Sequence, residues 1–314
     1  DRVYYGIEMF IFSTLLTKLL PLYVIILLGY IAGKFLNVKK ETIAPLLIYI
    51  VIPVVIFAGV VDTKLNLNVI FLPILFFLLG SFIALFAFYL ASFIWKDSTR
   101  NMFAFTSGTG NTGYFGIPVA IAIFGDKVIG IASLIFLGIM LYEATVGFFL
   151  MARGNFTVKK SLTRLLTLPI LYAYLLGLLV NLSHVQLGGI FLDTAATFRG
   201  AFTILGMMII GMGLSDIKKI EFDFKFIGLI FLIKFAVWPL LMILLIFLNS
   251  TFFKIFDNSL DKILLLMTIV PLAANTVSYA TLLKTKPEKA SLAVLLSTFF
   301  ALFYIPLIVA YLLK

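Results

Sequence analysis

The sequence of 314 residues contains no cysteine and a single histidine, His184. The absence of cysteine excludes disulfide bonds, thiolate metal sites and thiol catalysis, and one histidine cannot build a histidine-rich metal site. Charged residues are also scarce, at 12% of the chain, whereas soluble domains carry about 25%. This composition argues against a water-soluble enzyme, a disordered chain and a nucleic-acid-binding protein.

Hydrophobic residues make up 63% of the chain. A single water-soluble core cannot hide so much apolar surface, so most of it must face a lipid bilayer. A membrane-spanning helix needs about 20 mostly apolar residues, and this criterion predicts an all-α, multi-pass protein of the cell membrane. Ten spans are predicted, at residues 14–34, 43–61, 67–95, 100–124, 128–152, 164–184, 190–214, 224–249, 261–283 and 289–313.

The basic residues predict an orientation in the membrane. The net charge is +10, and most of the 24 Lys and Arg residues lie in the odd-numbered loops between the predicted spans. The positive-inside rule places these loops in the cytoplasm, which puts both termini on the extracytoplasmic side. We therefore interpret the positive charge as a signal of orientation rather than of nucleic-acid binding.

The polar stretch 153–163 divides the chain into two halves of five predicted spans, residues 1–155 and 156–314. Because five is an odd number, the two halves enter the membrane in opposite directions. If they share a fold, they form an inverted repeat, which is a common architecture of secondary transporters.

The fourth predicted span of each half contains residues that disrupt helices. Both spans also contain the dipeptide Asn-Thr, as Asn111-Thr112 and Asn275-Thr276, at a depth near the middle of the membrane. Irregular backbone at this depth must be buried in protein or line a cavity, so the matched positions predict a binding site. Helix packing is the alternative role for each segment taken alone. The helix-disrupting residues are Gly110, Gly116, Pro118 and Pro271, and Gly113 belongs with the two dipeptides to the predicted binding site.

Glu143 and Lys234 are the charged residues that lie deepest inside the predicted spans. Ionisable residues inside a membrane are costly and are functional candidates by default. Their similar depth allows them to pair, either as a permanent structural ion pair or as a proton or ion switch. Alternatively, Lys234 offsets the charge of an anionic substrate.

Several of these motifs together resemble the auxin efflux carrier family, which includes the plant PIN-FORMED proteins and many bacterial and archaeal relatives. The resemblance covers nearly the whole chain, although the long central loop of the long plant members is missing and Glu143 matches no family position. The motifs are Asn111-Thr-Gly-Tyr-Phe-Gly-Ile-Pro118, Phe124-Gly125, Ala152-Arg-Gly154, Lys234-x-x-x-x-Pro239, Val270-Pro271 and the segment 291–306.

The resemblance implies two inverted five-helix repeats, with spans 1, 2, 6 and 7 as a scaffold and spans 3–5 and 8–10 as a transport domain. It further implies that spans 4 and 9 are broken and cross near Pro118 and Pro271. A small organic anion, such as a carboxylate or an auxin-like compound, would bind beside this crossover and move by an elevator-type mechanism. Sodium-coupled bile acid carriers are more distantly similar.

The sequence contains no nucleophile–base pair, metal cluster or phosphate loop, so we do not expect an enzyme. An anion channel and a membrane sensor that binds its ligand without transport are alternatives to a carrier. No cofactor is expected apart from a coupling ion. Na⁺ would need oxygen ligands near Asn111 and Asn275, whereas H⁺ would use Glu143. The pattern Gly29-x-x-x-Gly33 favours close helix packing, and a homodimer contact is one use of it.

Overall fold

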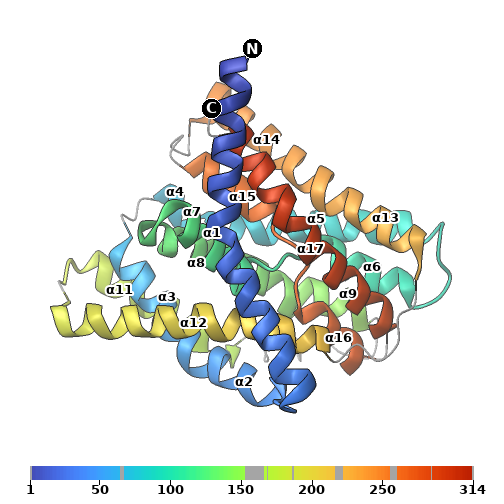
Figure 1. Cartoon of the computed structure of the whole chain (residues 1–314), viewed down its shortest axis with the longest axis horizontal. Helices are drawn as coiled ribbons and strands as arrows, with labels where there is room; N and C mark the ends of the chain where they lie inside the picture. The colour runs from blue at the N-terminus through green and yellow to red at the C-terminus, as the bar shows by residue number, and fades with distance from the viewer. Residues whose placement is uncertain are drawn as a thin grey trace.

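The computed structural model describes residues 2–63, 67–152, 166–167, 169–185, 187–215, 222–254, 260–283 and 285–312. Within these ranges all regular secondary structure is helical, which confirms the predicted all-α class (Figure 1). The helical segments there that are long and apolar enough to cross a membrane are Phe12–Phe35, Lys40–Asp62, Leu72–Ala91, Asp126–Ala152, Gly189–Ser215, Phe224–Phe253 and Pro287–Ala310. Pro169–Leu182 is a shorter apolar helix.

Three of the long segments contain turns of π-helix, which is usually rare and concentrated at functional sites. The first consists of α2 (Lys40–Leu46), η1 (Leu47–Val51) and α3 (Ile52–Asp62). The second consists of η3 (Asp126–Val128), α8 (Ile129–Tyr142), η4 (Glu143–Gly147) and α9 (Phe148–Ala152). The third consists of α13 (Phe224–Leu232), η5 (Ile233–Val237), α14 (Trp238–Leu248) and η6 (Asn249–Phe253).

Two further segments are interrupted, as their glycine and proline residues predict. The first consists of α6 (Thr99–Gly108), η2 (Thr112–Gly116) and α7 (Ile117–Phe124), and Thr109 between them is extended, with φ −111° and ψ 169°. The second consists of α15 (Asp261–Thr268) and α16 (Asn275–Leu282), with Pro271 between them. Proline lacks a backbone N–H and therefore cannot continue the helical hydrogen-bond ladder.

The helices pack in two groups (Figure 1). In the first group, α1 (Arg2–Phe35) packs along α12 (Gly189–Ser215), and α3 packs against α11 (Pro169–Leu182) and α12. In the second group, α5 (Leu72–Ala91) packs against α6 and α8, and α17 (Pro287–Leu312) packs against α16. The short helix α4 (Leu67–Ile70) precedes α5. Contacts of α1 with α17 and of α3 with α8 join the two groups.

Glycines allow the backbones of α1 and α12 to touch. A Cβ atom on Gly211 would lie 1.8 Å from the carbonyl oxygen of Ile26, and one on Gly29 would lie 2.2 Å from the carbonyl oxygen of Met208. Gly33 of α1 packs against Ser215 of α12. The face that carries Gly29 and Gly33 is therefore covered by α12 of the same chain, which confirms the close helix packing that the Gly29-x-x-x-Gly33 pattern favours. A homodimer stays a prediction.

We expect Gly211→Ala to destabilise the fold, because the added methyl group would overlap the backbone of α1. Overpacking of this kind costs about 1–3 kcal/mol, so the thermal midpoint in detergent micelles should fall. Gly200→Ala in the same helix is the matched control, since a Cβ atom there has no neighbour within 4 Å. This control should be neutral or slightly stabilising. Equal midpoints for the two variants would contradict the close helix contact.

Candidate functional site

The two interrupted segments meet through their backbones. The N–H of Asn111 donates a hydrogen bond to the carbonyl oxygen of Pro271 over 2.8 Å. The indole N–H of Trp238 donates to the carbonyl oxygen of Ser107 over 2.8 Å, and the backbone N–H of Leu272 donates to the Ser297 hydroxyl over 3.1 Å. These bonds satisfy backbone groups that the interruptions would otherwise leave without partners in a water-poor interior.

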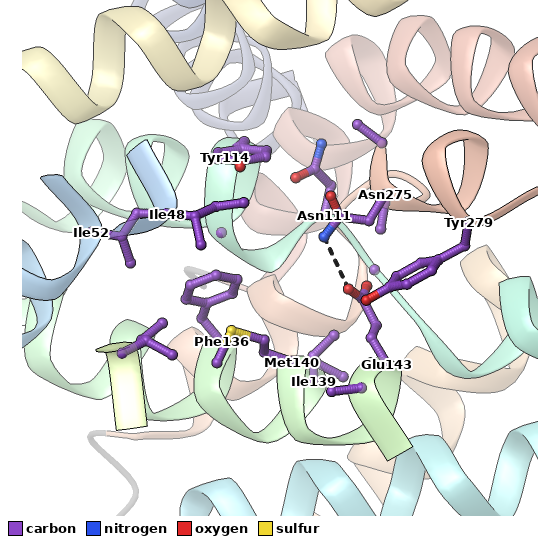
Figure 2. A pocket seen from close by; sticks show the side chains of 16 residues that line it. Ile48, Ile52, Asn111, Tyr114, Phe136, Ile139, Met140, Glu143, Asn275 and Tyr279 are labelled. Carbon is purple, nitrogen blue, oxygen red and sulfur yellow. Dashed lines mark hydrogen bonds between the residues drawn. The ribbon is translucent and has the colours of Figure 1, made fainter. Parts of the chain in front are cut away.

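Glu143 lies beside both interruptions, and only 4% of its surface is exposed. One carboxylate oxygen accepts a hydrogen bond from the Thr109 hydroxyl. The other accepts a hydrogen bond from the side-chain amide of Asn275 over 3.0 Å, drawn as a dashed line in Figure 2. Glu143, the first residue of the π-helical turn η4, therefore connects the break after α6 with the start of α16.

Lys234 in η5 is 2% exposed and approaches the first interruption from another side. Its ammonium group donates to the carbonyl oxygen of Thr109 over 3.4 Å and lies 4.9 Å from the centre of the Trp238 ring system. A Cβ atom on Gly110 would lie 2.4 Å from the Lys234 nitrogen, so glycine at this position admits the ammonium group.

Thr109 lies between the two buried charges. Its hydroxyl group contacts Glu143 and its carbonyl oxygen contacts Lys234. Among the residues that the structure describes, no ion pair joins Glu143 directly to Lys234. The direct pair that their similar depth allowed is thus replaced by an arrangement in which one residue contacts both charges.

A cavity of about 100 Å³ lies next to Glu143 (Figure 2). Its polar side chains come from Asn111, Tyr114, Glu143, Asn275 and Tyr279, and the rest of the lining is mostly apolar. The lining includes residues of both helix groups, so the cavity lies between these groups. Lys234 does not line it. The apolar lining residues that Figure 2 labels are Ile48, Ile52, Phe136, Ile139 and Met140.

A second cavity, of about 280 Å³, adjoins the first. The two cavities share Ile48, Tyr114 and Asn275 among their lining residues. The second cavity extends to Lys40 and Glu41 at the start of α2. It therefore extends from the start of α2 towards the buried polar groups.

Three buried polar atoms in the two Asn-Thr dipeptides have no hydrogen-bond partner. They are the side-chain amide nitrogen of Asn111 and the hydroxyl oxygens of Thr112 and Thr276. A buried polar group without a partner costs about 1–3 kcal/mol, so such a group calls for an explanation. Asn111 lines the first cavity, where a ligand can supply the missing partner.

A family model described as "Membrane transport protein" matches residues 14–309 of this chain. The chain belongs to this membrane transport protein family. The match confirms the resemblance to auxin efflux carriers that the motifs predicted. The chain is also 29% identical, over 305 residues, to an uncharacterized transporter of Methanocaldococcus jannaschii, with 90% of this chain and 94% of that protein covered. Members of a transporter family are generally not enzymes, in agreement with the absence of catalytic motifs in the sequence.

In this member of the membrane transport protein family, the predicted site residues occupy different positions around the cavity. Gly110, Asn111, Gly113, Glu143 and Asn275 line it, whereas Lys234 lies outside the lining and contacts the carbonyl oxygen of Thr109. The side chains of Thr112 and Thr276 are buried outside its lining. Gly110 and the other predicted residues, Gly116, Pro118 and Pro271, are backbone features of the breaks. The binding roles of all these residues stay predictions.

Three further residues at the site of this transporter were not predicted from the sequence. Thr109 contacts both buried charges, Tyr279 lines both cavities, and Trp238 holds the carbonyl group of Ser107. The tyrosine and the tryptophan look like ordinary residues of apolar helices. The position of Thr109 between Gly108 and Gly110 was a signal that could have identified it.

We expect Thr109→Val to destabilise this transporter by about 1.5–3 kcal/mol, because it removes a hydrogen bond to a buried carboxylate. Thr112→Val is the matched control: it makes the same change at a hydroxyl group that is equally buried but has no partner. This second change should be neutral or stabilising. Thermal midpoints of both variants in micelles test the difference, and equal losses would contradict the special role of Thr109.

Proposed function

We propose that this protein is a secondary transporter that binds a small organic anion in the cavity beside the two interrupted segments. The observation that carries the proposal is the buried, unpartnered amide nitrogen of Asn111, a residue that lines this cavity. Amide N–H groups are suitable donors to carboxylate oxygens. The apolar walls suit the organic body of such a ligand.

The proposal includes the ten-span arrangement, with residues 1–155 and 156–314 as inverted repeats. In this arrangement α1, α2–α3, α11 and α12 belong to the scaffold, and the helices around the two breaks belong to the transport domain. The cavity is lined by Ile48 and Ile52 on the first side and by Glu143 and Asn275 on the second. Sliding of one group along the other would expose the cavity to alternate sides of the membrane, as an elevator-type mechanism requires.

Lys234 supports anion binding from a distance in this proposal. It does not line the cavity, but its ammonium group contacts the backbone of Thr109, next to the lining residue Gly110. In a low-dielectric interior, its charge acts over this separation more strongly than it would in water. Na⁺ coordinated near Asn111 and Asn275 and H⁺ on Glu143 are the two candidate coupling ions.

We expect Asn111→Leu to reduce uptake of the preferred anion by about 10- to 100-fold, because it removes the unpartnered donor while largely keeping the side-chain shape. Uptake by proteoliposomes across a panel of carboxylates, including malate, benzoate and indole-3-acetate, measures this effect. Ser133→Ala is the matched control, since the Ser133 hydroxyl is also buried and unpartnered but lies outside the cavity lining.

The same assay separates a carrier from its alternatives. A carrier gives saturable uptake and counterflow, whereas unsaturable flux with single-channel currents would indicate an anion channel. Binding of the carboxylate without any flux would indicate a sensor. Either of the latter two results would contradict the proposed transport.

We also expect the second cavity to open to the cytoplasm, because it reaches Lys40 in a loop that the positive-inside rule places there. The chain has no native cysteine, so single cysteines report accessibility without background. Ser278→Cys, in the lining of this cavity, should react with a membrane-impermeant thiol reagent only from the cytoplasmic side. Ser250→Cys, in η6 at the predicted extracytoplasmic end of the span 224–249, should react with this reagent only from the outside. Reaction of both cysteines from one side would contradict the predicted orientation.

A further inference from the structure

We propose that the carboxylate of Glu143 competes with the substrate carboxylate for the Asn275 amide, so that an organic anion binds only when Glu143 takes up a proton. This inference rests on the proposed function, because it concerns the same cavity. It assigns H⁺ as the coupling ion. Glu143 loses its negative charge by protonation when the negatively charged substrate binds.

The two amide side chains at the cavity are in different states. The Asn275 amide donates to Glu143 over 3.0 Å, whereas the Asn111 amide nitrogen has no partner. All three side chains line the same cavity, and Figure 2 shows the hydrogen bond between the Asn275 amide and Glu143. A substrate carboxylate that uses both amides must therefore take the Asn275 donor from a carboxylate that already holds it.

The charge that faces the cavity is negative. Glu143 lines the cavity, and the positive charge of Lys234 lies on the far side of Thr109. The other titratable groups near Glu143 are the hydroxyls of Tyr114, Tyr142 and Tyr279, which are neutral near pH 7. The Tyr142 hydroxyl donates to the carbonyl oxygen of Phe105 over 2.9 Å. These groups carry no charge, so Lys234, on the far side of Thr109, is the cation that offsets part of the repulsion between Glu143 and an incoming anion.

Protonation of Glu143 removes this repulsion. Two carboxylates that share a buried site cannot both remain ionised, so one of them takes up a proton. In the proposed step, a proton from water forms an O–H bond on the Glu143 oxygen that faced Asn275, and the hydrogen bond between the two side chains breaks. The Asn275 amide then donates to the substrate carboxylate. The net charge of the site is unchanged, since one anion and one proton enter together.

Anion binding and proton binding are then coupled reciprocally. Where Glu143 is ionised in the free protein, the dissociation constant of the anion should rise about tenfold for each unit of pH. An inwardly directed proton gradient should likewise accelerate uptake of the anion into liposomes.

The test uses the full chain in lipid nanodiscs and in proteoliposomes, with radiolabelled malate, benzoate and indole-3-acetate as probes. Binding is measured between pH 5 and pH 9, and proton uptake on binding is measured with a pH indicator in weak buffer. We expect about one proton taken up per anion at the alkaline end. Glu143→Gln should bind the anion at pH 9 at least tenfold more tightly than the unmodified protein, with an affinity independent of pH. Its uptake should no longer respond to a proton gradient.

Asp193→Asn is the control, because Asp193 is an exposed carboxylate on α12 outside both cavities, and its pH profile should match that of the unmodified protein. If Glu143→Gln does not fold, the proton count on the unmodified protein decides the matter. Binding without proton uptake, or uptake that requires Na⁺ instead of a proton gradient, would overturn this inference and leave the proposed function standing. No binding of any of the carboxylates by either protein at any pH would overturn both.

Discussion

The hydrogen bond between the backbone N–H of Asn111 and the carbonyl oxygen of Pro271 joins two helical segments that are both interrupted. In a bilayer, an interrupted helix is stable only where other protein groups satisfy its free backbone atoms. Each interruption here supplies part of what the other needs, and Trp238 and Ser297 supply further bonds. The position of the cavity follows from this contact, because Asn111 and Asn275 reach it from the two joined segments.

Thr109 extends this constraint to the buried charges. A carboxylate and an ammonium group in a low-dielectric interior each need polar partners, and both find them on this one residue. The extended backbone of Thr109 makes this possible, because its hydroxyl and carbonyl groups face different neighbours. The interruption thus organises the electrostatics of the site in addition to shaping the cavity.

The sequence was informative wherever a residue type has a direct consequence for the backbone. Glycine and proline at positions 110–118 and at Pro271 predicted the interruptions, and the long apolar runs predicted the helical class. Counting residues gave Glu143 and Lys234 similar predicted depths, and both side chains are buried in the structure. It could not predict their partners, because depth along a helix says nothing about the direction in which a side chain points. Whether the two charges pair, and what packs against Gly29 and Gly33, stayed open in the sequence for this reason, since each depends on which neighbouring element lies opposite.

The π-helical turns have a geometric consequence for the faces of these helices. Each such turn adds a residue relative to the regular α-helix, and one residue corresponds to a rotation of about 100°. Ile48, Tyr114, Glu143 and Lys234 all lie in such turns, and the first three line the cavity. In each of these spans, the apolar face before the π-helical turn is therefore rotated about the helix axis relative to the apolar face after it. The polar centre of this protein is built by shifts in helical phase, which let a helix present one face to its neighbours and another to the cavity.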